Sequence, residues 1–430
     1  MQKKFKRNLI ALTLSVTLGG ASTLASAAGF ALIEQSASGM GNAFAGAAAT
    51  AEDASTVFFN PAGMSMLSGS QFAVAGHAID LSVKFSNAGT SRAAGGGAIP
   101  LGPVSGGNGG DAGGVAFVPN LYVTKPINEQ WTIGLGVNAP FGLKTEYDNT
   151  WVGRYQGIKS EITTININPA VSYKITDTVA LGGGVNYQRL KAKLTNAVMT
   201  GVATPDAFAT LDADDDAWGW NLGVLAQITP ETRVGVSYRS QLKYTLSGTT
   251  SAAIPGGPTV LPTTNITADV TLPDIASLSV IHKLNDQWEL LGDITYTWWS
   301  KIDTLDVMTS GGTLDTLAFK FDNTWRVSLG ANYHYNERWT FKGGVAIDQT
   351  PVRDQYRTVR LPDNDRTWLA FGGKFKISQG AAIDFGYARL FFSDAPINNT
   401  KIGSGGLTTT VVGTYQGSVN ILSVQYSQAF

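Results

Sequence analysis

The chain has 430 residues, 43% of them hydrophobic, and its 31 Lys and Arg nearly balance its 32 Asp and Glu. This charge balance argues against a nucleic-acid partner. With no cysteine, the chain can form neither a disulfide framework nor a thiolate metal site. The mean hydropathy of +0.02 resembles that of a soluble protein, but it does not exclude a β-barrel, because lipid-facing and lumen-facing residues average out along each strand.

The first 27 residues have the pattern of a secretory signal peptide. Basic residues Lys3 to Arg7 precede an apolar run from Leu9 to Leu18, and Ala25-Ser26-Ala27 forms a small-residue cleavage site. The apolar run has about 10 residues, whereas a membrane-spanning helix needs roughly 20. We therefore expect residues 1–27 to be removed on export.

Residues 28–69 are rich in Ala, Ser and Gly and do not alternate between apolar and polar positions, although the run from Gly46 to Asp53 is compatible with a helix. The segment is too short for a core of its own. We expect it to pack as a plug inside a barrel formed by residues 70–430. The alternative is a disordered periplasmic tail, which would expose Phe58 and Phe59 to water.

From Phe72 onward, apolar residues occupy every second position, and six short polar turns alternate with long loops. This pattern predicts an all-β fold, a fourteen-stranded antiparallel transmembrane barrel, because outer-membrane barrels have even strand numbers and short periplasmic turns. The turns lie at residues 126–130, 176–178, 229–232, 284–287, 335–338 and 378–380.

The strand phases predict which side chains face lipid. Trp339, Phe341 and Val345 alternate with Thr340 and Lys342. The same counting, continued from Val234 through Tyr238, Leu242 and Tyr244, predicts that Arg239 and Lys243 face the lumen, as does Arg326 in its own strand. A basic side chain facing lipid at mid-bilayer would cost about 2–4 kcal/mol. The chain ends on Phe430, and this ending resembles the signal that the barrel assembly machinery recognises in exported barrels.

Several motifs together resemble the FadL-type family of outer-membrane long-chain fatty acid transporters. They begin with Ala28-Gly29-Phe30 and continue as Ser38-Gly39-Met40-Gly41-Asn42-Ala43-Phe44-Ala45-Gly46, Asn60-Pro61-Ala62, Asn138-Ala139-Pro140-Phe141-Gly142-Leu143, Trp151-Val152-Gly153-Arg154-Tyr155, Thr324-Trp325-Arg326 and Leu361-Pro362-Asp363-Asn364-Asp365-Arg366. The resemblance covers essentially the whole mature chain. It identifies a hatch motif that includes Gly39, Gly41, Asn60, Pro61 and Ala62.

The resemblance implies passive transport of a hydrophobic compound across the bacterial outer membrane. Cargo would be captured at outer loops, bound in the lumen and released sideways at a kinked third strand. Long-chain fatty acids are the first expected cargo, and aromatic hydrocarbons of the toluene and xylene type are the alternative. We also expect contact with outer-membrane lipid and lipopolysaccharide, and a monomer, because fourteen strands can close within one chain.

The kink is expected at Asn138, Ala139, Pro140, Phe141 and Gly142. Proline removes a ladder donor and is normally confined to edges, bulges or breaks. A broken ladder in a bilayer is costly unless its backbone groups face protein or a cavity, which favours a functional break. The alternative is that Pro140 lies where the strand leaves the membrane and starts an outer loop.

A fatty acid requires an apolar slot for its tail and donors for its carboxylate. For the tail we expect Phe30, Leu32, Phe58, Phe59 and Phe141. For the carboxylate we expect Arg189, Lys191 and Lys193, with Arg239, Lys243 and Arg326 as alternatives. The strand phase turns Arg189 toward lipid, so this site needs either a bulge near Gln188 or a strand that has already left the membrane, where the three basic residues would form only a solvated rim.

No catalytic, metal or cofactor site is expected. The acidic run in the expected outer loop from Thr195 to Ala217 lacks the Gly and Glu that an EF-hand places at its sixth and twelfth positions. A general porin is disfavoured because a plug would block its pore, and an energised receptor is disfavoured because those barrels have about 22 strands. An enzyme is the least favoured function, because no nucleophile and base form a recognisable pattern.

Overall fold

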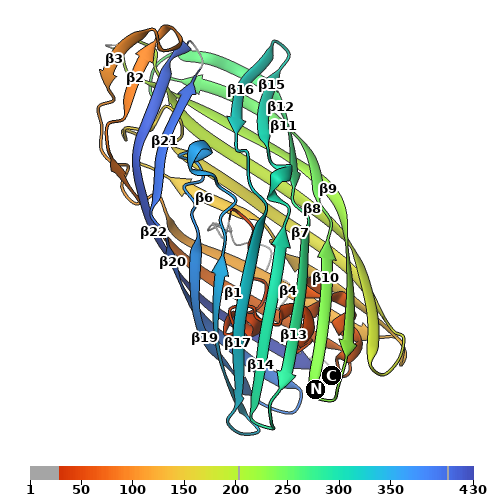
Figure 1. Ribbon diagram of the computed structural model, residues 1–430. Coiled ribbons are helices and arrows are strands. Elements are labelled where there is room, and N and C mark those ends of the chain that lie inside the picture. Colours follow the sequence, from red (N-terminus) through yellow and green to blue (C-terminus); the bar gives the residue numbers. More distant parts are fainter. Residues whose placement is uncertain (1–28, 202–203, 404–405) are drawn as a thin grey trace, which may run out of the picture.

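A computed structural model describes residues 29–201, 204–403 and 406–430, and the expected signal peptide at 1–27 lies outside them. Within the described residues the chain forms a closed fourteen-stranded antiparallel barrel, as predicted (Figure 1). The first wall strand, β1 (Gln71–Asn87), closes the barrel on the last, β22 (Thr408–Ala429). The short turns lie at one end of the barrel, called here the turn end, and the long loops lie at the other, the loop end.

Most wall strands run in one piece. They are β1, β4 (Gly114–Pro126), β7 (Lys159–Lys174), β8 (Val179–Val198), β9 (Ala207–Gln227), β14 (Trp288–Thr297), β17 (Thr324–His334), β18 (Trp339–Asp348), β19 (Arg366–Lys376) and β22. The others are divided into two parts: β5 (Trp131–Asn138) with β6 (Gly142–Glu146), β10 (Thr232–Arg239) with β11 (Leu242–Ala253), β13 (Ile275–Lys283) with β12 (Thr259–Leu272), and β20 (Ala381–Phe392) with β21 (Ala395–Ile402). Hairpins at the loop end are β2 (Ser91–Ala94) with β3 (Ile99–Pro103) and β15 (Thr304–Thr309) with β16 (Gly312–Ala318).

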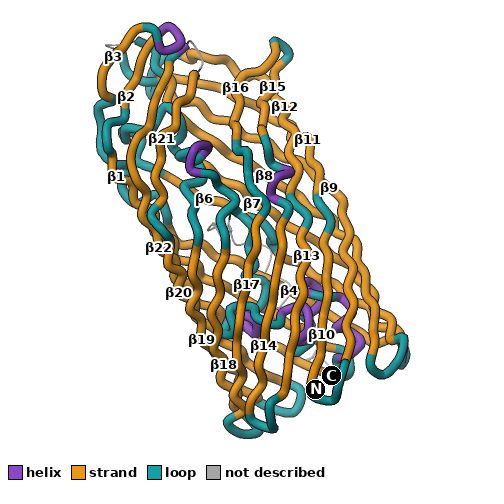
Figure 2. Tube along the Cα trace, viewed as in Figure 1, coloured by secondary structure: helices purple, strands orange, loops and turns teal. Residues whose placement is uncertain are grey.

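The N-terminal segment, residues 29–70, lies inside the barrel near the turn end, where Figure 2 shows its short helices. These helices are α2 (Ala37–Met40), α3 (Ala47–Thr50), α4 (Thr56–Phe59) and η1 (Pro61–Met66). Single 3-10 turns occur outside this segment at η2 (Gly95–Gly97), η3 (Trp299–Lys301) and η4 (Asp354–Tyr356). Across the described ranges, no helix is both long enough and apolar enough to cross a membrane. The plug predicted from sequence is therefore present in the lumen.

Glycines in the wall allow the plug to approach the strands closely. A Cβ built on Gly223 would lie 1.9 Å from Oδ1 of Asn60, and one on Gly182 would lie 2.2 Å from the backbone nitrogen of Ala62. Asn60 is itself fully buried and donates hydrogen bonds to the carbonyls of Ala48 (2.7 Å) and Val224 (3.0 Å). The motif Asn60-Pro61-Ala62 is thus seated against wall positions that only glycine can occupy.

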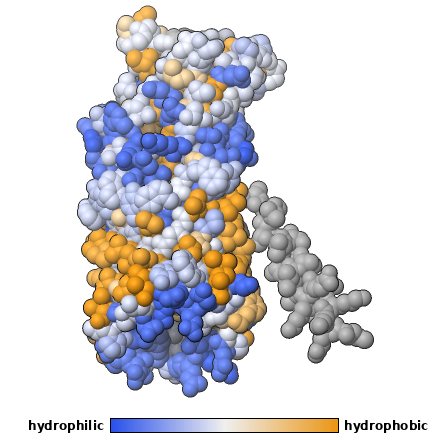
Figure 3. Space-filling view, turned by 90° about the vertical axis from the view of Figure 1, so that its right-hand side faces the viewer, coloured by the Kyte–Doolittle hydropathy of each residue, from blue (hydrophilic) through white to orange (hydrophobic). Residues whose placement is uncertain are grey.

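The alternation predicted for most strands is present. On β18 the side chains of Phe341 and Ile347 are 45% and 63% exposed, whereas Lys342 and Asp348 are buried. On the face seen in Figure 3, hydrophobic residues gather in a band across the lower half of the barrel, with hydrophilic residues above and below it. Trp131 and Trp288, which follow turns, pack against Tyr173 and Tyr333 at 4.6 and 4.7 Å between ring centroids. These aromatic pairs suit the interface at the turn end of the band.

The predicted phase of the β10–β11 strand is wrong beyond Arg239. Val236 faces outward, but Leu242 and Tyr244 are buried in the lumen and Lys243 is exposed. The division at Ser240 and Gln241 shifts the alternation by one residue, which moves every later side chain to the opposite face. Lys243 is therefore excluded from the lumen.

Candidate functional site

Three cavities follow one another through the barrel interior above the plug. The outer cavity, about 480 Å³, lies among the ends of β8, β9, β11 and the β15–β16 hairpin and includes Arg360 and Lys401. The middle cavity, about 80 Å³, shares Leu194, Leu317 and Arg360 with it. Apart from Ser160 and Arg360, the side chains that line the middle cavity are all apolar. The inner cavity, about 120 Å³, lies directly above the plug.

An aromatic cluster separates the middle cavity from the inner one. Phe30 lines the middle cavity and Trp299 lines the inner one, and their ring centroids are 5.1 Å apart. Phe141 packs against both, at 6.0 Å from Phe30 and 6.3 Å from Trp299. All three side chains are buried. A ligand that moves inward must displace or pass this cluster.

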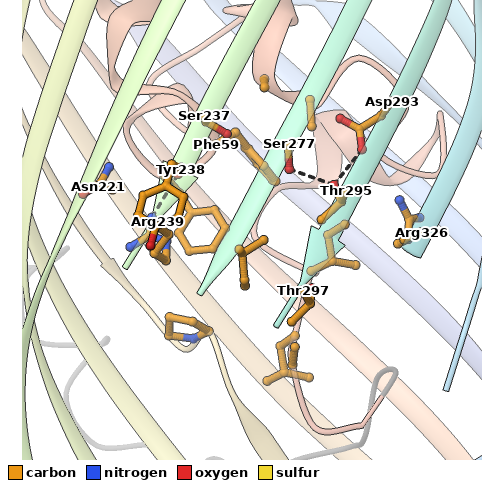
Figure 4. A pocket seen from close by; sticks show the side chains of 18 of the residues that line it. Phe59, Asn221, Ser237, Tyr238, Arg239, Ser277, Asp293, Thr295, Thr297 and Arg326 are labelled. Atoms are coloured by element: carbon orange, nitrogen blue, oxygen red, sulfur yellow. Dashed lines mark hydrogen bonds between the residues drawn. The ribbon is translucent and has the colours of Figure 1, made fainter. Parts of the chain in front are cut away.

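The inner cavity combines apolar plug residues with polar wall residues. Leu32, Phe58, Phe59 and Pro61 come from the plug, and Pro140 comes from the division between β5 and β6. Figure 4 shows the polar side of the cavity. It is lined by Asn221, Ser237, Arg239, Ser277, Asp293, Thr295, Thr297, Arg326 and Asp348. A mostly apolar cavity with a few placed polar groups is the usual form of a small-molecule site.

Arg326 has hydrogen-bonding capacity to spare. Its Nη2 donates to the carbonyl of Ala43 in the plug at 2.8 Å, and its guanidinium lies over the ring of Trp368 at 5.0 Å. Among the described residues, its Nε and Nη1 have no hydrogen-bond partner, although the residue is only 6% exposed. Because buried donors normally find partners, these two groups mark a place for an acceptor.

Arg239 lies on the opposite side of the same cavity. It donates to the side chain of Asn186 and to the carbonyl of Phe58 (3.0 Å), and it stacks over the Phe58 ring at 4.3 Å. Arg239 thus joins the wall to the plug. The two arginines predicted as alternatives, Arg239 and Arg326, are the basic residues that line the inner cavity.

The structure does not bring Arg189, Lys191 and Lys193 into the lumen. The β8 ladders run without a shift past Gln188, so the expected bulge is absent and the three side chains face outward. The loop expected from Thr195 to Ala217 is also wrong in extent, because β8 reaches Val198 and β9 begins at Ala207. The basic residues instead lie opposite the acidic run across the β8–β9 ladder: Arg189 with Asp216, Lys191 with Asp214 and Lys193 with Asp212. They form a charged outer rim, which was the stated alternative.

The third wall strand is divided at the residues expected to form a kink. β5 pairs with β7 as far as Asn138–Asn166, and β6 resumes at Gly142–Thr163, so one extra residue is accommodated between them. On the other side, the β4–β5 ladder extends only to Leu121–Val137. Since β6 remains paired with β7, Pro140 lies within a wall strand and does not start an outer loop.

Backbone groups at this division bond to the plug. Leu32 donates to the carbonyl of Pro140 at 2.8 Å, and Gly142 donates to the carbonyl of Phe30 at 2.8 Å. The side chain of Gln35 donates to the carbonyl of Ala139 at 2.9 Å. The plug therefore supplies partners that a continuous neighbouring strand would otherwise provide, as a break inside a membrane requires.

Sequence reasoning missed Arg360 and Trp299. Arg360 donates to the Ser160 hydroxyl at 3.1 Å and lines both the outer and the middle cavities. Burial lowers its pKa to about 10, so it remains charged at neutral pH. Its position directly before the motif that begins at Leu361 is a signal that could have identified it. Trp299 carried no signal, because a Trp at a strand end also suits a membrane interface.

Comparisons with known proteins give one consistent result. The model of a family described as outer membrane protein transport protein (OMPP1/FadL/TodX) matches residues 19–430. Outer membrane protein P1 of Haemophilus influenzae is 32% identical over an alignment of 473 positions, which covers 100% of both chains. The long-chain fatty acid transport protein of Escherichia coli O6:H1 is 30% identical over 410 residues, which cover 87% of this chain and 89% of that protein.

Solved structures share the fold. A Pseudomonas aeruginosa FadL homologue superposes with a TM-score of 0.85 at 26% identity, covering 94% of this chain and 100% of that one. The Ralstonia pickettii toluene transporter TbuX gives a TM-score of 0.67 at 19% identity, covering 92% of this chain and 98% of that one. The second likeness shows a common architecture.

Proposed function

Since the chain belongs to the OMPP1/FadL/TodX family of outer-membrane transport proteins, we propose that it carries long-chain fatty acids passively into the cell. Members of this family are transport proteins for hydrophobic compounds and not enzymes. In the proposed route, the cargo enters the outer cavity, passes the apolar middle cavity and binds in the inner cavity. It then leaves sideways at the division between β5 and β6, while residues 28–69 act as the hatch that closes the lumen below.

The observation that carries the choice of cargo is the pair of unused donors on Arg326. A carboxylate can accept from either of these N–H groups, and such charge-assisted bonds are about twice as strong as neutral ones. Phe58, Phe59 and Leu32 supply apolar contacts for the tail in the same cavity. Each CH₂ removed from water contributes roughly 0.8 kcal/mol, so a long tail adds substantially to binding.

Binding of labelled oleate to the purified protein tests this assignment. We expect Arg326→Leu to weaken oleate binding roughly tenfold or more, which corresponds to the loss of charged hydrogen bonds. Arg233→Leu is the matched control, because Arg233 also donates to plug carbonyls, those of Ala49 and Thr50, but does not line the inner cavity. Equal oleate affinity in both variants would refute Arg326 as the carboxylate anchor.

Lateral release is supported by the ladder that stops at Leu121–Val137 and by the presence of Pro140 in the lining of the inner cavity. Exit into the bilayer would spare the tail an aqueous passage. Replacing Pro140 and Gly142 with Val should favour a continuous strand and reduce oleate uptake by cells, while leaving oleate binding intact. Pro126→Val, near a short turn of the same sheet, is the control. Unchanged uptake in a correctly assembled barrel would exclude exit at this place.

Aromatic hydrocarbons are the second candidate cargo, and the apolar lining of the middle cavity favours them. Apart from Ser160 and Arg360, this lining offers a small uncharged molecule only apolar contacts. Uptake of toluene and of oleate by the same cells separates the two. Hydrocarbon uptake that persists in Arg326→Leu, with no oleate uptake by the wild type, would select the hydrocarbon.

Further proposed partners follow from the barrel surface. Arg189, Lys191 and Lys193 lie on the exposed outer face, where the phosphates of lipopolysaccharide are available to basic groups. Phe430 is 78% exposed and stacks on Phe72 at 5.9 Å, which leaves it accessible to the barrel assembly machinery. Closure of β1 on β22 within one chain supports a monomer.

A further inference from the structure

A row of asparagines crosses the lumen side of the wall between the inner cavity and the division of the third strand. Its members are Asn221 on β9, Asn186 on β8, Asn166 and Asn168 on β7 and Asn138 at the end of β5. All five are 3% exposed or less. They belong to adjacent wall strands, so their amides form a continuous polar line across an otherwise tightly packed interface with the plug.

The amides are joined directly to one another. Asn166 donates to Asn138 at 3.1 Å and to Asn186 at 3.2 Å. Asn186 and Asn168 each donate to Asn221, at 2.9 and 3.0 Å. Arg239 donates to Asn186, and this hydrogen bond connects the row to one of the two arginines that line the inner cavity.

Some amide atoms in the row lack a hydrogen-bond partner in the described part of the chain. Within the described residues, Nδ2 of Asn221 has no hydrogen-bond partner, nor do the side-chain oxygens of Asn166 and Asn168. An unpaired amide buried away from water costs about 1–3 kcal/mol, so a row that served only to fill space would be better built from apolar residues. Asn221 also lines the inner cavity, which places a free N–H donor beside any ligand there.

The two ends of the row coincide with the two ends of the proposed release step. Asn221 and Arg239 stand at the inner cavity, and Asn138 is the last residue before the division that contains Pro140. Between these ends the plug contributes apolar side chains, with Val57 and Met64 packed close to Gly134 on β5. A fatty acid leaving by this route would slide its tail over apolar plug residues, and its carboxylate would need donors along the wall.

We propose that Asn221, Asn186, Asn166 and Asn138 form a track that passes the carboxylate of a fatty acid from Arg239 to the lateral exit. Within the described residues, the Nδ2 groups of Asn221 and Asn138 at the two ends of the row have no hydrogen-bond partner and are free to donate to the headgroup. Between them, the Nδ2 groups of Asn186 and Asn166 would donate to the passing carboxylate in place of their neighbours in the row. None of them carries a full charge, so the carboxylate is supported along the path without being trapped there. The track rests on the proposed function, and it makes the release step selective for a monocarboxylate over an uncharged molecule of the same length.

The test compares uptake of oleate with uptake of methyl oleate, which has the same tail and no charge. In cells that contain Asn166→Asp or Asn166→Ala, we expect the ratio of oleate to methyl oleate uptake to fall roughly tenfold or more, in line with lost hydrogen bonds to a charged group. The aspartate variant places a fixed carboxylate on the path and should give the larger fall. Oleate binding to either purified variant should stay near the wild-type value, because Arg239 and Arg326 are unchanged.

Asn332→Ala and Asn332→Asp are the matched controls. Asn332 is 2% exposed, faces the lumen from β17 and bonds to Asn42 of the plug at 3.0 Å, but it lies outside the row. Its variants should leave the uptake ratio unchanged, and barrel assembly is checked by heat-modifiable migration in every case. An unchanged ratio in assembled Asn166 variants, or an equal fall for both cargoes, would overturn the track. Absence of oleate uptake by the wild type would instead refute the proposed function on which the track depends.

Discussion

The ionic connection between the plug and the wall gives the sharpest quantitative prediction. Glu52, between α3 and α4, accepts from Lys342 on β18 at 2.7 Å and from Lys374 on β19 at 2.9 Å. Lys342 also donates to the carbonyl of Ser38 at 2.9 Å. The Glu52 side chain is 24% exposed and the Lys342 side chain is 2% exposed, so the pair is largely shielded from water. The substitution Glu52→Gln keeps the size of the side chain and removes its charge.

Removing one partner of a buried ion pair costs about 3–5 kcal/mol, because the remaining charge stays buried. Asp384 also lies near both lysines, at 3.9 Å from Lys342 and 3.7 Å from Lys374. Because Asp384 already faces the two ammonium groups and the glutamine can still accept a hydrogen bond, we take the lower end, about 3 kcal/mol. This weakens the attachment of the plug to the wall roughly a hundredfold.

Hydrogen exchange of the purified protein in detergent measures this attachment. Amides of residues 37–66 should exchange roughly a hundredfold faster in Glu52→Gln, while strand amides keep their protection. Glu289→Gln is the control, because Glu289 accepts from Asn332 at 3.0 Å and faces His334, both in the barrel wall. If exchange of the plug is the same in Glu52→Gln as in the wild type, the ion pairs contribute nothing to holding the plug.

Two further predictions concern the plug. A Cβ on Gly344 would lie 2.2 Å from the backbone of Asn42, whereas Gly343 has open space around it, so Gly344→Leu should unseat the plug and raise its exchange while Gly343→Leu should not. Equal effects of the two leucines would contradict close packing at Gly344. Burial raises the pKa of Glu34 from 4.5 to about 7. The folded protein therefore binds this proton more tightly than the unfolded chain, and plug stability should fall as pH rises from about 4.5 to about 7. Glu34→Gln should remove that part of the pH dependence of plug exchange, and an unaltered pH profile in this variant would exclude Glu34 as its source.

Strand number, turn positions and the outward faces of most strands followed from the sequence. The reason is that lipid tolerates few basic side chains, so each spanning strand must display the alternation, and the short turns leave little room for ambiguity. The division at Pro140 was also predictable, because proline cannot donate to the ladder. The motif around Asn60 indicated a plug but not the wall glycines that receive it.

The sequence could not choose between the two sets of basic residues that it suggested for a carboxylate, Arg189, Lys191 and Lys193 or Arg239, Lys243 and Arg326. Local phase placed Arg189 correctly toward the outside, but the site prediction required a bulge that the continuous β8 ladders do not contain. In the β10–β11 strand, the sequence predicted no irregularity where the structure has one. The alternation shifts by one residue at Ser240, and the apolar pattern gives no sign of this because it continues through that position.

The sequence by itself determined that the chain closes into a membrane barrel with a plug, because alternation, turns and an apolar N-terminal segment are local properties of the chain. Only the tertiary structure decided which polar groups meet inside. Arg326, Arg239 and the asparagine row come from different strands, and the register and closure of the barrel set their proximity. The spacing of residues along the chain does not reveal which side chains from different strands become neighbours inside the barrel. The contacts in the lumen could therefore be learned only from the folded structure.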